Sequence, residues 1–114
     1  MFDFLKPKVP QSSVDDVKKL LDTKAKIVVL DVRTPQEYQK GHIENSINIP
    51  VDAIQKEVTT KISDKKTPIY VYCLSGSRSI FAVDMMIKLG YTHVFDITNG
   101  LLAWRAKQYP LENK

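Results

Sequence analysis

The alternation of short apolar runs with helical patterns constrains the fold of this chain more than any other feature. Four runs are apolar almost throughout and lack period-2 alternation, which is typical of parallel strands covered on both faces. They are Ile27 to Asp31, Ile47 to Ile49, Ile69 to Tyr72 and Val94 to Asp96. Because helical patterns separate the runs, the sequence predicts an α/β domain with a central parallel sheet. At 114 residues, the chain has the usual size of one domain.

Five segments have the apolar spacing or the end signals of helices. The first follows a serine cap, and the second begins with a capping box that has proline at its first position. The segments are the one after Ser12 or Ser13 with Val14, Val17, Leu20 and Leu21 on one face; Thr34 to Gly41; the stripe of Val51, Ile54, Val58 and Ile62; Ser77 to Leu89, with Ile80, Val83, Met86 and Ile87 on one face and Gly90 as its end; and Gly100 to Lys107, with Trp104 as its expected anchor.

One cysteine and two histidines limit the chemistry open to the chain. A single cysteine cannot form an internal disulfide, and this set is too small for a usual structural zinc site. We therefore expect no metal, no other cofactor and a reducing, cytoplasmic setting. A lone cysteine is more often inert core filling than a reactive group, so the residues around Cys73 decide its role.

The net charge of +4 comes from scattered lysines. These lysines are not interleaved with aromatic residues, so we expect solvated helix faces rather than a nucleic-acid surface. A mild positive charge still helps a small anionic substrate to approach. The apolar runs are far shorter than the ~20 residues of a membrane span, and we expect no membrane partner. The N-terminus lacks the long apolar core and small-residue cleavage site of a signal peptide. A mature chain whose signal peptide had been removed would also lack them.

Two segments follow predicted strand ends and carry polar side chains. Ligands of open parallel sheets bind beyond the carboxyl ends of the strands, so we expect Asp31-Val32-Arg33 and Cys73 to lie at one edge of the sheet. In the loop Cys73 to Arg78, Gly76 permits a tight bend and inward-pointing amides. These amides, the following helix N-terminus and Arg78 favour a thiolate and form an anion cradle. The sequence therefore predicts Cys73 as a nucleophile.

An ordered set of motifs from about Ser12 to Trp104 resembles the rhodanese family. The motifs are Leu30-Asp31-Val32-Arg33, Glu37-Tyr38, Gly41-His42-Ile43, Ile47-Asn48-Ile49-Pro50, Tyr72 to Ser79, Gly90-Tyr91 and Asn99-Gly100 with Trp104. The resemblance implies a rhodanese-like three-layer sandwich, with a mainly parallel five-stranded sheet and helices on both faces. The expected domain covers residues 12–110, after an N-terminal extension of residues 1–11. Asn99 stands where the family usually has glycine, but asparagine tolerates left-handed backbone angles.

The resemblance implies a sulfurtransferase of the thiosulfate sulfurtransferase type. Its catalytic Cys73 would move a sulfane sulfur from a small anionic donor, such as thiosulfate or a persulfide, to cyanide, a thiol or a protein acceptor. We expect Leu74, Ser75, Gly76, Ser77 and Arg78 to bind the substrate, and Asp31, Arg33 and Ser79 to support the site. A monomer is favoured.

Several alternatives remain open at this point. Four residues separate Cys73 from Arg78, as in sulfur-transferring rhodaneses, whereas related phosphatases have five, so phosphatase activity is disfavoured. Two other functions are open: a non-catalytic protein-binding module and a protein-specific sulfur carrier. Arg33 is expected either to contact substrate or to pair with Glu37 or Glu44. For His42 we expect a structural hydrogen bond.

Overall fold

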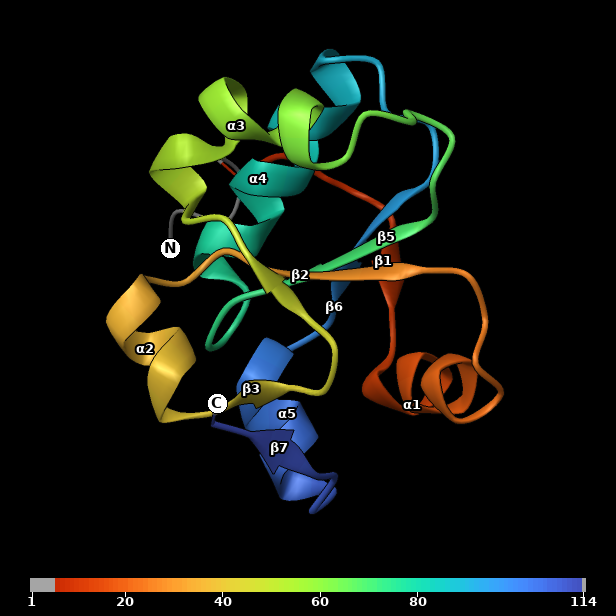
Figure 1. Cartoon of the computed structure of the whole chain (residues 1–114), viewed down its shortest axis with the longest axis vertical. Coiled ribbons are helices and arrows are strands. Elements are labelled where there is room, and N and C mark those ends of the chain that lie inside the picture. The colour runs from red at the N-terminus through yellow and green to blue at the C-terminus, as the bar shows by residue number, and fades with distance from the viewer. Residues whose placement is uncertain (1–5, 114) are drawn as a thin grey trace.

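The computed structural model of the chain describes residues 6–113, and a parallel five-stranded sheet forms its centre (Figure 1). All four pairings between neighbouring strands are parallel. In spatial order the strands are β1 (Gln11–Ser12), β6 (Val94–Ile97), β5 (Ile69–Tyr72), β2 (Val28–Asp31) and β4 (Ile47–Asn48). The prediction of an α/β fold built on a five-stranded parallel sheet is confirmed.

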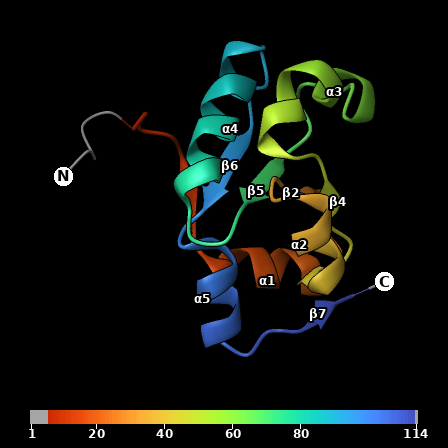
Figure 2. The same ribbon diagram turned by 90° about the vertical axis from the view of Figure 1, so that its left-hand side faces the viewer.

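Helices cover both faces of this sheet, as Figure 2 shows. On one face lie α3 (Ile54–Lys61), which the short 3-10 helix η2 (Val51–Ala53) precedes, and α4 (Ser77–Lys88). On the other face lie α1 (Val14–Asp22) and α5 (Gly100–Ala106). The remaining helix, α2 (Pro35–Lys40), follows β2 and lies at the edge of the sheet where that strand ends. The expected three-layer sandwich is therefore present.

Each face of the sheet has its own apolar core. Leu30, Val71 and Met86 belong to the core under α3 and α4. Val17, Ile97 and Trp104 belong to the core under α1 and α5. Trp104 is fully buried, and its indole N–H donates to the carbonyl of Pro110 at 2.9 Å. It anchors α5, as predicted.

The predicted helix ends are formed by the expected residues. Ser13 is the N-cap of α1, and its side chain accepts from the amide of Asp16. Thr34 and Glu37 form the reciprocal capping box of α2. The Glu37 carboxylate accepts from the Thr34 amide at 2.9 Å, and the Thr34 hydroxyl accepts from the Glu37 amide at 3.2 Å. The capping box therefore places Glu37 in the first turn of α2.

The expected buried face of α4 is partly wrong. Val83 and Met86 are fully buried as predicted, but Ile87 is 41% exposed. The buried face is instead completed by Ser79 and Ala82, two small residues that permit close packing against the sheet. Ile87 lies on the flank of this face, because consecutive residues of a helix point in directions about 100° apart.

Three two-residue strands were not expected from the sequence. One is β1, which adds the fifth strand through the register pairs Gln11 with Asp96 and Ser12 with Ile97. The others are β3 (His42–Ile43) and β7 (Leu111–Glu112), which form a separate antiparallel pair. Sheet pairing thus includes Gln11, inside the expected extension of residues 1–11, and continues past residue 110. The apolar residues Phe2, Phe4 and Leu5 lie outside the described residues.

Candidate active site

The two segments expected at one edge of the sheet lie there side by side. Asp31 and Tyr72 are register partners on β2 and β5, so Val32 and Cys73 follow them at the same level. The amide of Val32 donates to the carbonyl of Tyr72 at 3.0 Å and continues the ladder. In Figure 1 the loop after β5 lies beside α2 at this edge. The carboxyl ends of the central strands thus frame the candidate site.

The sulfur of Cys73 is held by hydrogen bonds from its own loop. Cys73 is fully buried. Its Sγ accepts from the amide of Gly76 at 3.0 Å and from the amide of Ser79 at 3.4 Å. The thiol also lies 3.4 Å from the Ser79 hydroxyl oxygen. Ser79, expected only as a supporting residue, therefore contacts the sulfur directly.

The rest of the loop is exposed or half-buried, apart from the buried Gly76. Leu74, Ser75 and Ser77 are exposed, and Arg78 is half-buried. Gly76, the N-cap of α4, has a φ of +115°, in the region that favours glycine. A Cβ atom at Gly76 would meet no atom within 4 Å. There is therefore room for an atom directly beside Gly76, although the residue itself is buried.

The first turn of α5 holds the carbonyl groups of this loop, an arrangement that sequence reasoning missed. The amide of Leu101 donates to the carbonyl of Cys73, and the amide of Leu102 donates to that of Leu74, both at 3.0 Å. Asn99 precedes this turn with a φ of +59°, as expected for asparagine in the place of glycine. With its carbonyl oxygens bound by α5, the loop turns two of its amides toward the sulfur.

Arg78 forms a bidentate ion pair with Glu37 of α2. Its Nη1 lies 2.7 Å from Oε1 of Glu37, and its Nη2 lies 3.1 Å from Oε2. The Arg78 guanidinium lowers the pKa of Glu37 to about 2, with a smaller contribution from the Thr34 amide. The charge of Arg78 is therefore already balanced by a carboxylate.

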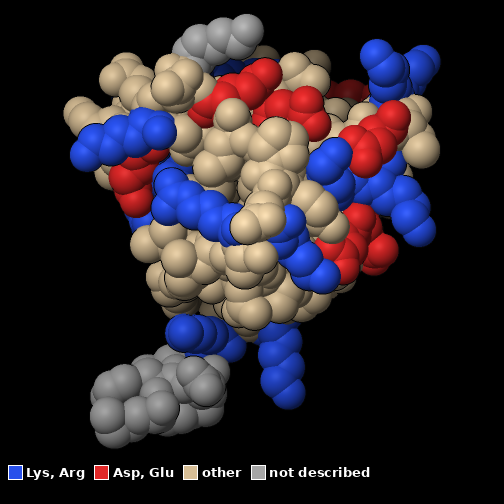
Figure 3. All heavy atoms as spheres, turned by 90° about the horizontal axis from the view of Figure 1, so that it is seen from below, with Lys and Arg blue, Asp and Glu red and all other residues tan. Residues whose placement is uncertain are grey.

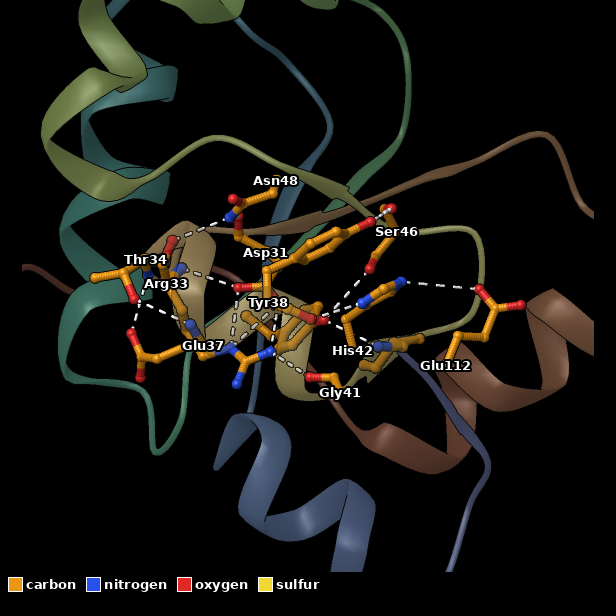
Figure 4. A network of polar contacts seen from close by, with 12 residues as sticks. Asp31, Arg33, Thr34, Glu37, Tyr38, Gly41, His42, Ser46, Asn48 and Glu112 are labelled. Atoms are coloured by element: carbon orange, nitrogen blue, oxygen red, sulfur yellow. Dashed lines mark hydrogen bonds and ion pairs between the residues drawn. The ribbon is translucent and has the colours of Figure 1, made fainter. Parts of the chain in front are cut away.

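Arg33 pairs with Asp31, so its expected partners Glu37 and Glu44 are wrong. Nη2 of Arg33 lies 2.7 Å from Oδ2 of Asp31, and the same nitrogen donates to the carbonyl of Gly41 at 2.7 Å (Figure 4). Both side chains are almost fully buried. This pair ties the end of β2 to the end of α2. Nε and Nη2 of Arg33 are both bonded to this scaffold beside the site.

His42 has the structural role expected of it. His42 Nδ1 lies 2.8 Å from the carbonyl of Tyr38, and its ring stacks on the Tyr38 ring with centroids 3.7 Å apart. The structural hydrogen bond predicted for His42 is thus present. His93 is exposed at the start of β6.

The sequence analysis did not single out Asp96, which is linked to the Cys73 sulfur through the Ser79 hydroxyl. It lies on β6, is 2% exposed and accepts a hydrogen bond from the Ser79 hydroxyl. Burial raises the pKa of Asp96, and hydrogen bonds from Ser79 and Gln11 offset part of that rise. In the sequence, Asp96 is simply the last residue of an apolar run. Its link to Cys73 becomes visible only in the structure, where α4 packs on β6.

Charged side chains elsewhere are mixed in sign. On the face shown in Figure 3, basic and acidic side chains lie next to one another. Over the described residues, ion pairs join Lys107 to Asp15 at 3.2 Å and Lys88 to Asp84 at 2.9 Å. Over residues 6–113, no three His, Cys, Asp or Glu side chains are grouped so as to hold a metal ion. None of the helices in that range has the length and apolar character needed to cross a membrane.

Fold and site together define an α/β sandwich with one thiol at the head of a strand-to-helix loop that directs amides at its sulfur. Residues 13–107 match the family described as the rhodanese-like domain. The chain belongs to this family, as its motifs predicted.

Two relatives match more than half of this chain. The chain is 38% identical over 65 residues to the thiosulfate sulfurtransferase PspE of Escherichia coli, covering 57% of this chain and 62% of that protein. It is 31% identical over 99 residues to the putative sulfur carrier protein YrkF of Bacillus subtilis, covering 87% of this chain and 52% of that protein. The matched part is thus less than two thirds of each relative. A rhodanese-related protein from Thermoplasma volcanium has a similar structure, with a TM-score of 0.81 and 30% identity over 93% of this chain and all of that one.

Proposed function

We propose that this chain is a sulfurtransferase in which Cys73 takes a sulfane sulfur from a donor, holds it as a persulfide and passes it on. One observation carries the proposal: the Cys73 sulfur lies at the end of β5 with the amides of Gly76 and Ser79 directed at it. Hydrogen-bond donors favour the charged form of the atom they bind. The thiolate is the nucleophilic form of cysteine. The name of the E. coli relative supports the same class of reaction.

In the first step, the Cys73 thiolate attacks the outer sulfur of the donor. With thiosulfate, the S–S bond of the donor breaks and sulfite leaves with the electron pair, while a new S–S bond forms on Cys73. Three negative charges enter the step and three leave it, so no other reactant is required. The loop amides stabilise the anionic persulfide as they do the thiolate.

In the second step, a thiophilic acceptor attacks the terminal sulfur of the persulfide. Cyanide becomes thiocyanate, or a thiolate becomes a persulfide, and the Cys73 thiolate is released with the electrons of the broken S–S bond. This is double displacement through a covalent intermediate. No metal or organic cofactor takes part in either step. The reducing cytoplasm is the setting that suits such a free thiol.

The ion pair between Arg78 and Glu37 bears on the choice of donor. Thiosulfate carries two negative charges, and the Arg78 guanidinium that would bind it is already bonded to the Glu37 carboxylate. Bringing the dianion beside that carboxylate costs repulsion, whereas a persulfide brings less charge to the loop. We therefore infer that persulfides are better donors than thiosulfate for this chain.

A second candidate function is that of a sulfur carrier that serves one protein acceptor. Two exposed leucines favour it, because Leu74 is 36% and Leu102 is 51% exposed and the Leu102 amide is bonded to the Leu74 carbonyl. An apolar rim beside the sulfur suits a protein surface better than cyanide. The name of the B. subtilis relative supports this candidate. A protein acceptor would then be sulfurated much faster than cyanide.

Turnover with a defined donor and acceptor tests the enzyme activity. We expect the chain to form thiocyanate from cyanide with thiosulfate, and faster with an alkyl persulfide as donor. Cys73→Ser should abolish the reaction, whereas Tyr91→Phe, which alters a buried hydroxyl bonded to the carbonyls of Val58 and Ile62, should retain it. Full activity in Cys73→Ser would refute the proposal. No turnover and no loading with any donor would identify a non-catalytic module.

A further inference from the structure

A buried carboxyl group lies behind the sulfur of Cys73, and the transfer steps above do not use it. We propose that Ser79 and Asp96 form a proton relay, in which the Asp96 carboxylate receives, through the Ser79 hydroxyl, the proton that Cys73 releases when it becomes the nucleophile. The use of this relay in sulfur transfer rests on the proposed function. The deprotonation itself can be measured with any electrophile.

Three elements bring the three groups of the relay together. Cys73 follows β5, Ser79 lies in the first turns of α4, and Asp96 lies on β6, the neighbour of β5. The thiol donates toward the Ser79 oxygen at 3.4 Å, and the Ser79 hydroxyl donates to Oδ1 of Asp96. Cys73 and Ser79 are fully buried and Asp96 is 2% exposed. The donors therefore point in one direction, from the sulfur to the carboxylate.

Proton transfer along this chain conserves charge and atoms. The S–H bond of Cys73 breaks and its proton joins Ser79 Oγ, while the original Ser79 proton forms an O–H bond on Asp96. One negative charge is buried before the transfer, on Asp96, and one after it, on Cys73. Because the number of buried charges is unchanged, the transfer adds no uncompensated charge to the core.

The hydrogen bonds of the relay reverse after the transfer. Asp96 then donates to Ser79, and the Ser79 hydroxyl donates to the thiolate. The sulfur now accepts three hydrogen bonds, from this hydroxyl and from the amides of Gly76 and Ser79. The raised pKa of Asp96, which burial causes, makes its carboxylate a better proton acceptor than an exposed aspartate.

The other groups that face the relay do not titrate near neutral pH. Asp96 also interacts with the Gln11 side chain of β1, and its register partner on β5 is Val71. Arg78 is the cation that interacts with Cys73, and arginine stays charged. Its partner Glu37 has a pKa of about 2. The dependence of the Cys73 alkylation rate on pH therefore reports on the relay.

Alkylation of Cys73 by iodoacetamide, a neutral electrophile, provides the test. In the relay the thiolate form is a tautomer of the thiol form with the same number of protons, so the wild-type alkylation rate rises with pH less steeply than the rate of a thiol that must lose its proton to solvent. Asp96→Asn keeps an acceptor oxygen but cannot take a proton. Its rate should rise tenfold for each pH unit, and near pH 6 it should be about tenfold or more below the wild-type rate.

Three further variants identify the cause of any change. Ser79→Ala should show the same steep profile as Asp96→Asn, and the double variant should be no slower than either, because the two residues act as a unit. Tyr91→Phe alters a buried hydroxyl away from Cys73 and should keep the wild-type profile. A profile in Asp96→Asn as shallow as that of the wild type would overturn the relay.

Ser79→Ala provides the same comparison if Asp96→Asn does not fold, because it removes the middle group of the relay. A wild-type alkylation rate that climbs with pH as steeply as that of Ser79→Ala would overturn the proposal. The measurement uses no sulfur donor. Failure to load sulfur would therefore refute the proposed function, while the alkylation profile would still decide the relay.

Discussion

Gly100 lies directly against the carbonyl group of Cys73. A Cβ atom at Gly100 would lie 2.3 Å from that oxygen and 3.0 Å from the carbonyl oxygen of Leu74. The same Cys73 oxygen accepts the amide of Leu101. The N-terminal turn of α5 can approach the sulfur-bearing loop this closely only because residue 100 has no side chain.

Gly100→Ala should disturb the loop and destabilise the fold. The added methyl group cannot be accommodated by rotation, because backbone atoms oppose it, and the φ of +46° is costly for alanine. We expect the free energy of unfolding to fall by about 2 kcal/mol or more, and the reactivity of Cys73 to fall as well. Denaturant unfolding and thiol alkylation measure the two effects.

Gly90→Ala is the matched control for this substitution. Gly90 also has a positive φ, of +102°, but a Cβ atom there would meet the flexible Lys65 side chain at 3.4 Å. The Gly90→Ala variant should be less stable than the wild type because of backbone strain, while the alkylation rate of Cys73 stays at the wild-type value. Equal loss of Cys73 reactivity in both variants would show that α5 does not shape the loop.

Glu37→Gln should improve the use of thiosulfate. Removing the carboxylate leaves Arg78 free to bind a dianion, so we expect KM for thiosulfate to fall about threefold, within the range of a partly exposed ion pair. KM for an alkyl persulfide should change much less. Steady-state kinetics with each donor measure this difference. Glu57→Gln, which makes the same charge change in an exposed pair with Lys61, should alter neither value, and a KM for thiosulfate that rises in Glu37→Gln would contradict this account of donor choice.

The same ion pair predicts a pH dependence of stability. Arg78 lowers the pKa of Glu37 from 4.5 to about 2. A carboxyl whose pKa is lowered by folding stabilises the protein above its unfolded pKa, and this contribution is lost as the pH falls through the folded value. The wild type should therefore have a larger free energy of unfolding than Glu37→Gln. This difference should be constant above about pH 5 and shrink between about pH 4.5 and pH 2. Urea unfolding of both proteins at several pH values measures the difference, and a gap that widens on acidification would be the wrong sign.

Asp31→Asn should be strongly destabilising. Asp31 is fully buried and carries the charge that balances Arg33, which is itself 3% exposed. Removal of one partner from a buried pair leaves an uncompensated charge and costs about 3–5 kcal/mol. Thermal or denaturant unfolding at neutral pH measures this loss. Asp22→Asn, in the exposed pair with Lys18, should cost no more than about 0.5 kcal/mol; similar losses in both variants would place Arg33 in contact with solvent.

Features that depend on neighbouring residues could be predicted from the sequence. The capping box of Thr34 and Glu37 lies within one helical turn, and the strand before Cys73 is an unbroken apolar run, so both are visible locally. The loop of Cys73 is predictable for the same reason. Its small residues, its glycine and its position between strand and helix are all local signals.

Contacts between distant segments could not be predicted in this way. Glu37 and Arg78 are 41 residues apart, and charge alone allowed Glu37 to be assigned to Arg33. Asp96 reaches Cys73 only through Ser79, because α4 packs over β6. The strands β1, β3 and β7 have two residues each, too few to show any periodicity. Ile87 was misplaced because two small residues, Ser79 and Ala82, take the buried face of α4.

The mass of the intact protein after incubation with an alkyl persulfide or thiosulfate tests the central claim most directly. We predict the addition of one sulfur atom, located on Cys73 by fragmentation and released by cyanide as one equivalent of thiocyanate. Cys73→Ser should gain no such sulfur. A wild-type protein that gains no sulfur from either donor, or a Cys73→Ser variant that gains it equally, would contradict the claim that Cys73 carries the sulfur.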